Sequence, residues 1–339
     1  FFFSSLRKKI RPDLKKLMCK NHVLRQYQFP PTALHFLWNE LHRLSIEKLV
    51  GNVDLFIASD WTQPPTKRAK RISLIHDLVV YTYPQTTTTK TEFNAQNFTI
   101  SHNIEHTQKM RLKWVKKESD LIIALSHATA SDVHTMLGVP EKRITTLYPF
   151  VKEQSIATSD TQRVTKKYGL GRPFLLTVGK IEPRKNIGRL IQAYTSIKSP
   201  SYDLVVVGAR GWDKTSGLEQ KDSIHMLGYV PEHDLQSLYY GASLFVLPSV
   251  YEGFGYPIVE AMSAGCPVLT SDISSMKEIA KGYGLLCDPK NVDDIAEKIK
   301  KIMNDKHLQK ELKEKGLKRA KDFSFEKYVE GLKKILNSV

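Results

Sequence analysis

Cysteine is scarce in this chain, and long apolar runs are missing. The 339 residues include only Cys19, Cys266 and Cys287, and no two of them form a CxxC pair. This excludes a disulfide scaffold and favours a reducing compartment. No apolar run approaches the length that crosses a bilayer, and FFFSSL at the start lacks the pattern of a signal peptide. We therefore expect a cytoplasmic protein.

Two kinds of ligand-binding motif are also missing. The sequence has no DxD triplet and no His or Cys cluster with metal-ligand spacing. We therefore predict that the protein binds no metal and no cofactor. No GxGxxG or GG loop occurs in the first hundred residues, so a glycine-rich phosphate loop is not expected in the first half of the chain.

Acidic residues are outnumbered by basic ones. Lys and Arg total 51 against 35 Asp and Glu, a net charge of +16, and residues 1–150 carry 22 basic against 12 acidic residues. Such a balance favours an anionic partner: nucleic acid, an acidic membrane surface or a phosphorylated substrate. Nucleic acid is not expected, because no aromatic–basic motif or known module is present. The basic segment 7–25 is either a solvated loop and helix or a patch that faces a membrane.

Short apolar runs alternate with helical patterns along the whole chain. In the first half, the predicted strands are FFFSS, 53–59, 71–78, 120–126 and 144–150, with helices at 32–49 and 104–118. In the second half, the predicted strands are 174–179, 203–208, 224–228, 243–248, 266–270 and 284–288, with helices from 187, at 232–241 and at 256–264. This alternation predicts an α/β protein with parallel, doubly wound sheets.

The length suggests two domains. We predict an N-terminal Rossmann-like domain at 1–151 and a polar linker at 152–172. A C-terminal Rossmann-like domain follows at 173–323, and an amphipathic helix occupies 324–339. Two such domains face each other across a cleft, which is a usual place for a ligand.

The stretch 249–267, SVYEGFGYPIVEAMSAGCP, is the most informative one. It follows an apolar strand and opens a helix, because Pro257 suits the first helical turn. A helix start offers free N–H groups and partial positive charge to a phosphate. Glu252 and Glu260 lie on either side of that start, and carboxylates accept hydrogen bonds from hydroxyl groups. The pattern predicts a ligand with a diphosphate between two sugars; the alternative is an ordinary strand–helix unit with two surface glutamates.

EGFGYPIVEAMSAGCPV closely resembles the signature of the retaining glycosyltransferases of family 4, which have the GT-B fold, and its two glutamates have the spacing found in that family. The resemblance implies that Glu252 contacts hydroxyls of the donor sugar and Glu260 the ribose of the nucleotide. It also places the residues between them at the donor: Gly253, Phe254, Gly255, Tyr256, Pro257 and Ile258.

TVGKIEPRKN, residues 177–186, resembles the segment of that family that binds the donor phosphates. Lys185 holds the usual lysine place, Lys180 stands where an arginine is common, and Arg184 adds a further cation. These cations are expected to neutralise a diphosphate leaving group; the alternative is a solvated loop. A histidine at the place of His76 often approaches the donor sugar in the family. The resemblance thus implies Glu252, His76 and Lys185 as catalytic residues.

The resemblance implies a retaining glycosyltransferase that moves a hexose from a nucleotide-diphosphate sugar to a glycan or lipid-linked acceptor. The sequences of these two motifs are most similar to those of mannosyltransferases of polysaccharide assembly. This similarity favours mannose as the transferred hexose, for example from GDP-mannose. The resemblance also implies that the domain at 173–323 binds the nucleotide sugar and that the domain at 1–151 is the acceptor side. It also predicts that the helix at 324–339 packs back toward the N-terminal domain. We expect peripheral association with the inner face of an anionic membrane.

The first domain departs from the family pattern. The family has an earlier strand, glycine-rich loop and helix, which this sequence lacks, so we expect that the first domain is incomplete and the chain truncated or unusually short. A non-catalytic GT-B-like binding or scaffold protein is the alternative.

Overall fold

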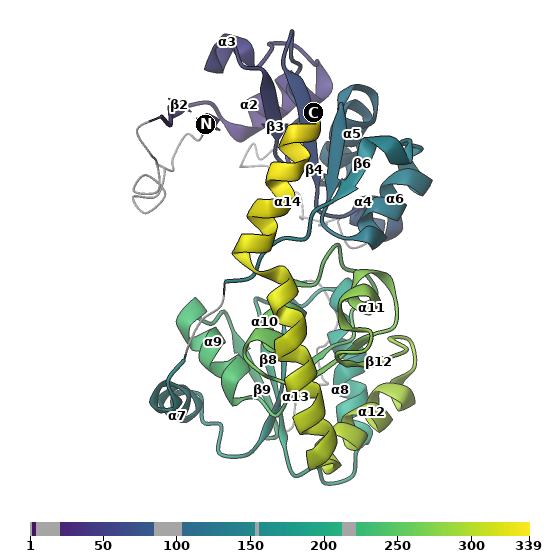
Figure 1. Ribbon diagram of the computed structural model, residues 1–339. Coiled ribbons are helices and arrows are strands. Elements are labelled where there is room, and N and C mark those ends of the chain that lie inside the picture. Colours follow the sequence, from purple (N-terminus) through teal and green to yellow (C-terminus); the bar gives the residue numbers. More distant parts are fainter. Residues whose placement is uncertain (1, 5–20, 85–103, 153–155, 212–221) are drawn as a thin grey trace, which may run out of the picture. The chain divides into compact units, whose positions relative to one another are not determined.

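The computed structural model describes residues 2–4, 21–84, 104–152, 156–211 and 222–339 (Figure 1). The chain divides into two compact units. The N-terminal unit holds residues 1–124, 130–146 and 339, and the C-terminal unit holds 125–129 and 147–338. Most of the predicted basic segment lies outside the described residues, because only 21–25 of it are described. Within the described residues, no helix is long and apolar enough to cross a membrane.

A parallel sheet in the order β3-β4-β5-β6 forms the centre of the N-terminal unit. Its strands are β3 (Leu55–Ala58), β4 (Lys70–Ile75), β5 (Leu121–Ala124) and β6 (Ile144–Thr146). The apolar side chains of β4 and β5 pack with those of three helices in one core. These helices are α4 (Val79–Thr82), α5 (Ile104–Glu118) and α6 (His127–Leu137). The predicted strands and the helix at 104–118 are confirmed, and the first predicted strand is β1 (Phe2–Ser4), which pairs in parallel with β2 (Arg25–Tyr27).

The helix predicted at 32–49 is wrong, because this stretch is broken into short pieces. They are α2 (Pro31–His35), the π-helical turn η1 (Phe36–Glu40) and α3 (Glu47–Val50). Between the last two, His42 and Leu44 have φ angles of 50° and 67°, which a right-handed helix does not allow. Trp38, which is 2% exposed, holds this bend by donating from Nε1 to the Leu44 carbonyl at 2.9 Å.

A parallel sheet of six strands forms the centre of the C-terminal unit, in the order β12-β11-β10-β7-β8-β9. Its strands are β7 (Phe174–Val178), β8 (Asp203–Val207), β9 (Ile224–Gly228), β10 (Leu244–Leu247), β11 (Val268–Ser271) and β12 (Leu285–Cys287). All six were predicted. The order changes direction between β7 and β10, and in open parallel sheets a ligand binds beyond the carboxyl ends of the strands at such a switch point.

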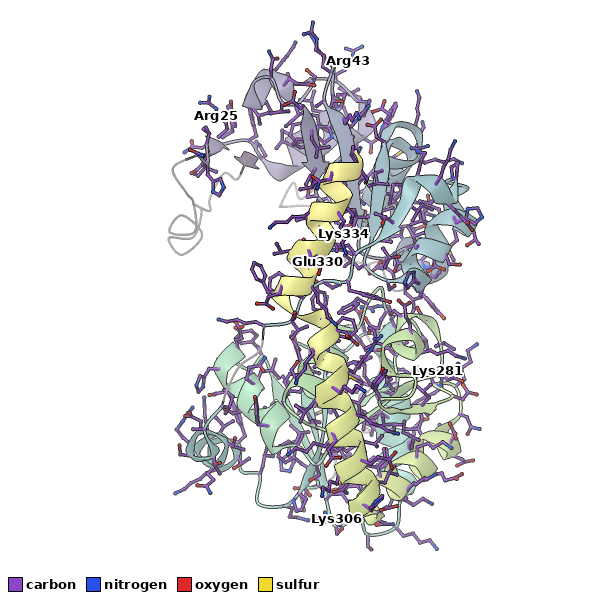
Figure 2. All side chains as sticks on the ribbon, in the orientation of Figure 1. Arg25, Arg43, Lys281, Lys306, Glu330 and Lys334 are labelled. Atoms are coloured by element: carbon purple, nitrogen blue, oxygen red, sulfur yellow. The ribbon has the colours of Figure 1, made fainter. Side chains whose placement is uncertain are left out.

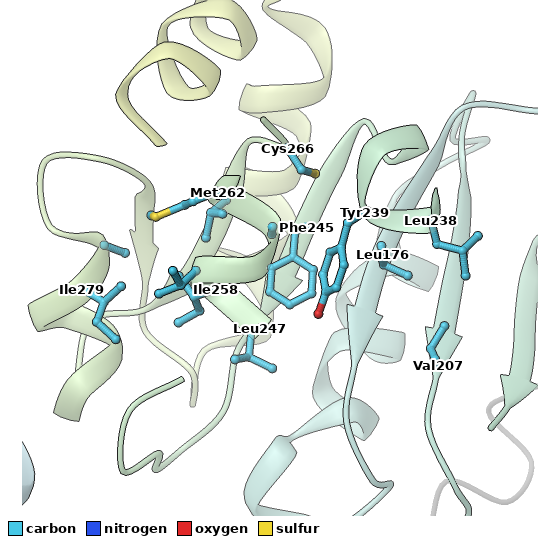
Figure 3. Close-up of a cluster of buried hydrophobic side chains, with 14 of the residues drawn as sticks. Leu176, Val207, Leu238, Tyr239, Phe245, Leu247, Ile258, Met262, Cys266 and Ile279 are labelled. Atoms are coloured by element: carbon cyan, nitrogen blue, oxygen red, sulfur yellow. The ribbon is translucent and has the colours of Figure 1, made fainter. Parts of the chain in front are cut away.

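Both faces of this sheet are buried, as a parallel sheet requires. Along β10, Phe245 and Leu247 belong to one core cluster while Leu244 and Val246 belong to the other. The first face is covered by α7 (Thr158–Lys167), α9 (Glu232–Gly241), α10 (Tyr256–Ser263) and α11 (Ser274–Ala280). The second is covered by α8 (Ile187–Ser196) and α12 (Val292–Asn304). Figure 3 shows part of the first cluster. Each fully buried Leu or Phe contributes about 1.5–3 kcal/mol, so the ends of β7 and β10 are firmly held.

Two further helices complete the chain. α13 (Lys306–Ala320) crosses α10, and Gly316 permits the contact, because a Cβ there would lie 3.3 Å from Cγ of Met262. α14 (Phe325–Ser338) covers the predicted C-terminal helix, whose packing onto the first domain stays a prediction. The stretch predicted as a linker contains α7, whose Val164 is fully buried in the core of the C-terminal unit.

Candidate active site

The two segments singled out in the sequence meet at the switch point of the six-stranded sheet. Residues 179–186 follow β7, and residues 248–255 follow β10. Several hydrogen bonds join them, among them those from the Val250 N–H to the Arg184 carbonyl and from Nδ2 of Asn186 to the Pro248 carbonyl, both at 2.9 Å. The carboxyl ends of neighbouring parallel strands thus bring Lys185 and Glu252 together from sequence positions far apart.

Glu252 is the centre of this meeting point. Its side chain is 9% exposed, and its two oxygens pair with different cations: Oε1 lies 2.7 Å from Nζ of Lys185, and Oε2 lies 2.7 Å from Nη1 of Arg184. Burial acts to raise the pKa of Glu252, but the charges of Lys185 and Arg184 outweigh it and hold the pKa at about 2. Glu252 is therefore an anion throughout the physiological pH range.

Arg184 is held on both sides. Besides the pair with Glu252, its guanidinium donates to Oε1 of Glu182 from Nη2 at 2.6 Å and from Nε at 3.1 Å, and to the Tyr251 carbonyl at 2.9 Å. Glu182 carried no signal in the sequence analysis. Two carboxylates and the two cations, Arg184 and Lys185, therefore form one cluster whose formal charges cancel.

Two glycines make room for this cluster. Gly179 has a φ of +154°, and a Cβ there would lie 3.0 Å from Cε of Lys185, so the lysine stem lies across it. Gly208 follows β8, and a Cβ there would lie 2.0 Å from the Gly179 carbonyl oxygen. A side chain at either position would displace the loop that carries Lys185.

The backbone that carries Glu252 is irregular, yet its carbonyls are bound. Within residues 247–253, six carbonyls accept hydrogen bonds from side chains of surrounding segments. The donors, in chain order of the carbonyls, are Thr270 to Leu247, Asn186 to Pro248, Ser271 to Ser249, Arg184 to Tyr251, Ser274 and Ser275 to Glu252, and Ser126 and Thr129 to Gly253. Buried carbonyls outside a sheet need such partners, and these hold Glu252 in one position.

The turn into α10 has the predicted form. Gly255 adopts a left-handed conformation with φ of 101° just before the helix, and Pro257 stands in the first turn. Phe254 and Ile258, predicted to lie at the donor, are 3% and 0% exposed and belong to the core. Their side chains are therefore not accessible to a ligand, and their predicted place at the donor stays a prediction. Tyr256, by contrast, is 43% exposed.

Glu260 has a partner that the sequence did not reveal. Oε2 of Glu260 accepts a hydrogen bond from the Tyr239 hydroxyl at 2.8 Å. Tyr239 is fully buried and packs beside Phe245, with ring centroids 5.5 Å apart (Figure 3). Burial raises the pKa of Glu260, against the effect of the tyrosine bond. Tyr239 thereby fixes the direction of this carboxyl group.

The remaining predicted residues are more exposed. Lys180 is exposed beyond the end of β7. His76 follows β4 in the N-terminal unit, where its side chain is 53% exposed and Nδ1 lies 3.6 Å from Oδ2 of Asp60. Its predicted approach to the donor stays a prediction. Among the described residues, no group of three or more His, Cys, Asp or Glu is placed to hold a metal ion; metal independence also stays a prediction.

Comparison with known proteins identifies the family to which the chain belongs. Residues 159–319 match the family described as glycosyl transferases group 1. O-antigen chain mannosyltransferase B of Escherichia coli is 32% identical over 281 residues, which cover 77% of this chain and 68% of that protein. The chain belongs to the group 1 glycosyltransferases. It is therefore a transferase enzyme, as predicted.

Two further proteins are similar to this glycosyltransferase. Serotype-specific mannosyltransferase WbdA of E. coli is 30% identical over 224 residues, which cover 62% of this chain but only 28% of that protein. The crystal structure of Anabaena HepE in complex with UDP and glucose superimposes with a TM-score of 0.66 at 18% identity, covering 80% of this chain and 72% of that one. The predicted GT-B fold with two parallel-sheet domains is confirmed.

Proposed function

We propose that this glycosyltransferase moves a hexose, and in particular mannose, from a nucleotide-diphosphate sugar to a glycan or lipid-linked acceptor, with retention of configuration and without a metal ion. The observation that carries the proposal is the buried Glu252, held ionised between Lys185 and Arg184 at the switch point. Mannose is supported by the E. coli relative, which is an O-antigen mannosyltransferase. The nucleotide donor is supported by HepE, whose structure contains UDP.

The diphosphate is assigned to Lys185, Lys180 and the start of α10. The Lys185 ammonium has three donors, of which the 2.7 Å bond to Glu252 uses one. It is thus able to hold Glu252 and a phosphate oxygen together. As the sugar–phosphate bond breaks, negative charge grows on the diphosphate, and these fixed cations and N–H groups stabilise it. They supply the positive charge that a divalent ion supplies in other transferases.

The two carboxylates are assigned to the two sugars of the donor. Glu252 accepts a hydrogen bond from a hexose hydroxyl and Glu260 from a ribose hydroxyl, since carboxylates are strong acceptors. Because both oxygens of Glu252 are held by cations, Glu252 positions the hexose and does not attack it. Retention then follows if the acceptor attacks on the face from which the diphosphate leaves, with the leaving phosphate taking the acceptor proton.

A lipid-linked acceptor presented at an anionic membrane surface is part of the proposal. The net charge of +16 supports it, because each basic residue near such a surface contributes about 1 kcal/mol. The proposal therefore also places the protein in the cytoplasm, at the inner face of that membrane.

A panel of sugar nucleotides tests the donor. Purified protein is incubated with GDP-mannose, GDP-glucose, UDP-glucose and UDP-N-acetylglucosamine, with and without EDTA, and the released nucleoside diphosphate is measured. We expect release from GDP-mannose above all, unchanged by EDTA. The configuration of the product anomer is read by NMR, and we expect it to be retained. Strong inhibition by EDTA would contradict metal independence, and release from none of the four donors would contradict the donor class.

A further inference from the structure

A pocket lies at the opposite edge of the six-stranded sheet from Glu252. All six strands are parallel, and the pocket opens where β10 and β11 begin, whereas Glu252 lies where β10 ends. Its volume is about 700 Å³. One wall consists of Ser243 and Pro267 before the two strands, with the ends of α9 and α10; the other wall is α13. The pocket is therefore separate from the candidate active site.

The α13 wall is strongly basic. Lys306, Lys310 and Lys313 line the pocket, and their spacing of four and three places them on one face of the helix. Lys306 begins the helix (Figure 2) and donates to Oε1 of Gln309 at 3.2 Å. No Asp or Glu belongs to the lining. The pocket thus carries three positive charges and no acidic side chain.

Lys315 of the same helix does not line the pocket, and it pairs with Glu311 at 2.6 Å, the usual arrangement one turn apart. Among the residues that the structure describes, neither Lys310 nor Lys313 has a carboxylate within 4 Å. Among the described residues, the lysines that line the pocket thus have no carboxylate within ion-pair distance, whereas Lys315 has one.

The helix ends in the opposite wall do not balance this charge. α9 ends at Gly241 and α10 at Ser263, both at the pocket. A helix C-terminus carries about half a negative unit charge, so the two together amount to about one. Three lysines face them, which leaves a surplus of about two positive charges. Stabilising the two helix ends therefore does not account for the lysine cluster.

We propose that this pocket binds a phosphate-bearing ligand at a second site outside the active site. The surplus charge matches one phosphate group or a diphosphate, and the hydroxyls of Ser243 and Ser263 add donors for phosphate oxygens. The volume lies within the range of about 300–1,000 Å³ typical of small-molecule sites. A free sugar phosphate and the headgroup of an anionic lipid share this chemistry.

Calorimetric titration with pyrophosphate and with glucose 1-phosphate at 0.15 M salt tests the site. Three full-length proteins are compared: the wild type, the pocket variant Lys306→Gln/Lys310→Gln/Lys313→Gln, and the control variant Lys300→Gln/Lys301→Gln/Lys318→Gln. Both variants lose three positive charges from exposed positions of α12 and α13, so net charge and fold are matched. Thermal unfolding curves verify that all three fold alike, and the active site contributes equally to each.

We expect one phosphate site per chain to disappear, or its affinity to fall at least tenfold, in the pocket variant alone. Equal pyrophosphate and glucose 1-phosphate binding in all three proteins, together with no pocket-dependent binding of lipid, would overturn the proposal. Lys310→Glu provides a graded second test, because it reverses one charge and should weaken binding by itself.

Vesicle sedimentation separates the two sources of phosphate. Vesicles of phosphatidylglycerol and of phosphatidylcholine are spun down with the same three proteins. Sedimentation with phosphatidylglycerol that the pocket variant alone loses assigns the site to a lipid headgroup. Pocket-dependent binding of the soluble phosphates without such sedimentation assigns it to a free phosphorylated metabolite.

Discussion

The two edges of the C-terminal sheet differ in whether their basic side chains are paired with carboxylates. At the carboxyl edge, Arg184 and Lys185 are held by Glu182 and Glu252 within 2.7 Å. At the amino edge, the lysines of α13 line a pocket without any carboxylate. The first arrangement fixes charged groups in position, as catalysis requires. The second leaves charge available to a mobile anion.

Burial accounts for the energetic side of this difference. The side chains of Lys185 and Glu252 are 11% and 9% exposed, so removing one partner leaves a charge in a poorly hydrated place. Lys306, Lys310 and Lys313 are exposed, and water solvates each of them. Substitutions at the two edges are therefore expected to differ in kind and in size.

Glu252→Ala should have the largest effect. It removes the acceptor assigned to the hexose and leaves Lys185 and Arg184 without their carboxylate. We expect kcat/KM for transfer to fall about 100-fold or more, since a hydrogen bond to a charged group contributes about 1.5–3 kcal/mol and loss of transition-state positioning adds to it. The rate of Lys310→Ala serves as the matched comparison at the other edge and should stay near wild type. Equal rates for Glu252→Ala and wild type would contradict the assignment.

Glu252→Gln should lower stability in a pH-dependent way. The pKa of Glu252 in the folded protein is about 2, below its ordinary 4.5, so the ionised group stabilises the fold above about pH 4.5 and loses this contribution as the pH falls towards 2. At pH 7, we expect a loss on the order of 3 kcal/mol, because a buried pair is broken. Urea unfolding at several pH values checks this. A difference between the two proteins that grows on acidification has the wrong sign.

The sequence predicted the strands better than the residues that hold the side chains of the candidate site in position. Alternating apolar runs revealed all six strands of the C-terminal sheet, because burial on both faces demands them. The motifs that contain Glu252, Glu260 and Lys185 drew attention to the strand ends where Lys185 and Glu252 pair; that a donor binds there stays a prediction. Tyr239 was missed because its partner Glu260 lies 21 positions away. Glu182 was missed because its contact with Arg184, two residues further on, depends on how the loop after β7 folds.

Three other misses have different causes. Ser126 and Thr129 bind the Gly253 carbonyl across more than 120 positions, and no pattern within either segment records such a contact. The helix predicted at 32–49 failed because His42 and Leu44 adopt left-handed conformations, which neither residue type favours. The lysine pocket was not predicted, since three lysines on a helix face are usual for a solvated surface.

Lys185→Ala should weaken binding of a nucleoside diphosphate by about tenfold while changing that of the nucleoside little. The removed ammonium is assigned to the phosphates, and one charge-assisted hydrogen bond contributes about 1.5–3 kcal/mol. Lys300→Ala removes the same charge from an exposed position of α12, outside both proposed phosphate sites, and is the control for net charge. Equal losses for nucleoside and nucleoside diphosphate, measured by calorimetry, would place Lys185 away from the diphosphate.

The smallest effect is expected for the stability of the pocket variant Lys306→Gln/Lys310→Gln/Lys313→Gln. Exposed lysines without acidic partners contribute little to folding. We expect its free energy of unfolding at pH 7 to stay within about 0.5 kcal/mol of wild type, or to rise slightly as repulsion is relieved. A loss of several kcal/mol in urea unfolding would mean that these lysines stabilise the helix ends across the pocket.

A crystal structure of the protein with its preferred nucleotide-diphosphate sugar tests the central claim most directly. We predict the diphosphate within hydrogen-bonding distance of Nζ of Lys185 and the start of α10, a hexose hydroxyl on Glu252, and a ribose hydroxyl on Glu260. A donor bound elsewhere, with the Lys185–Glu252–Arg184 cluster untouched, would contradict it.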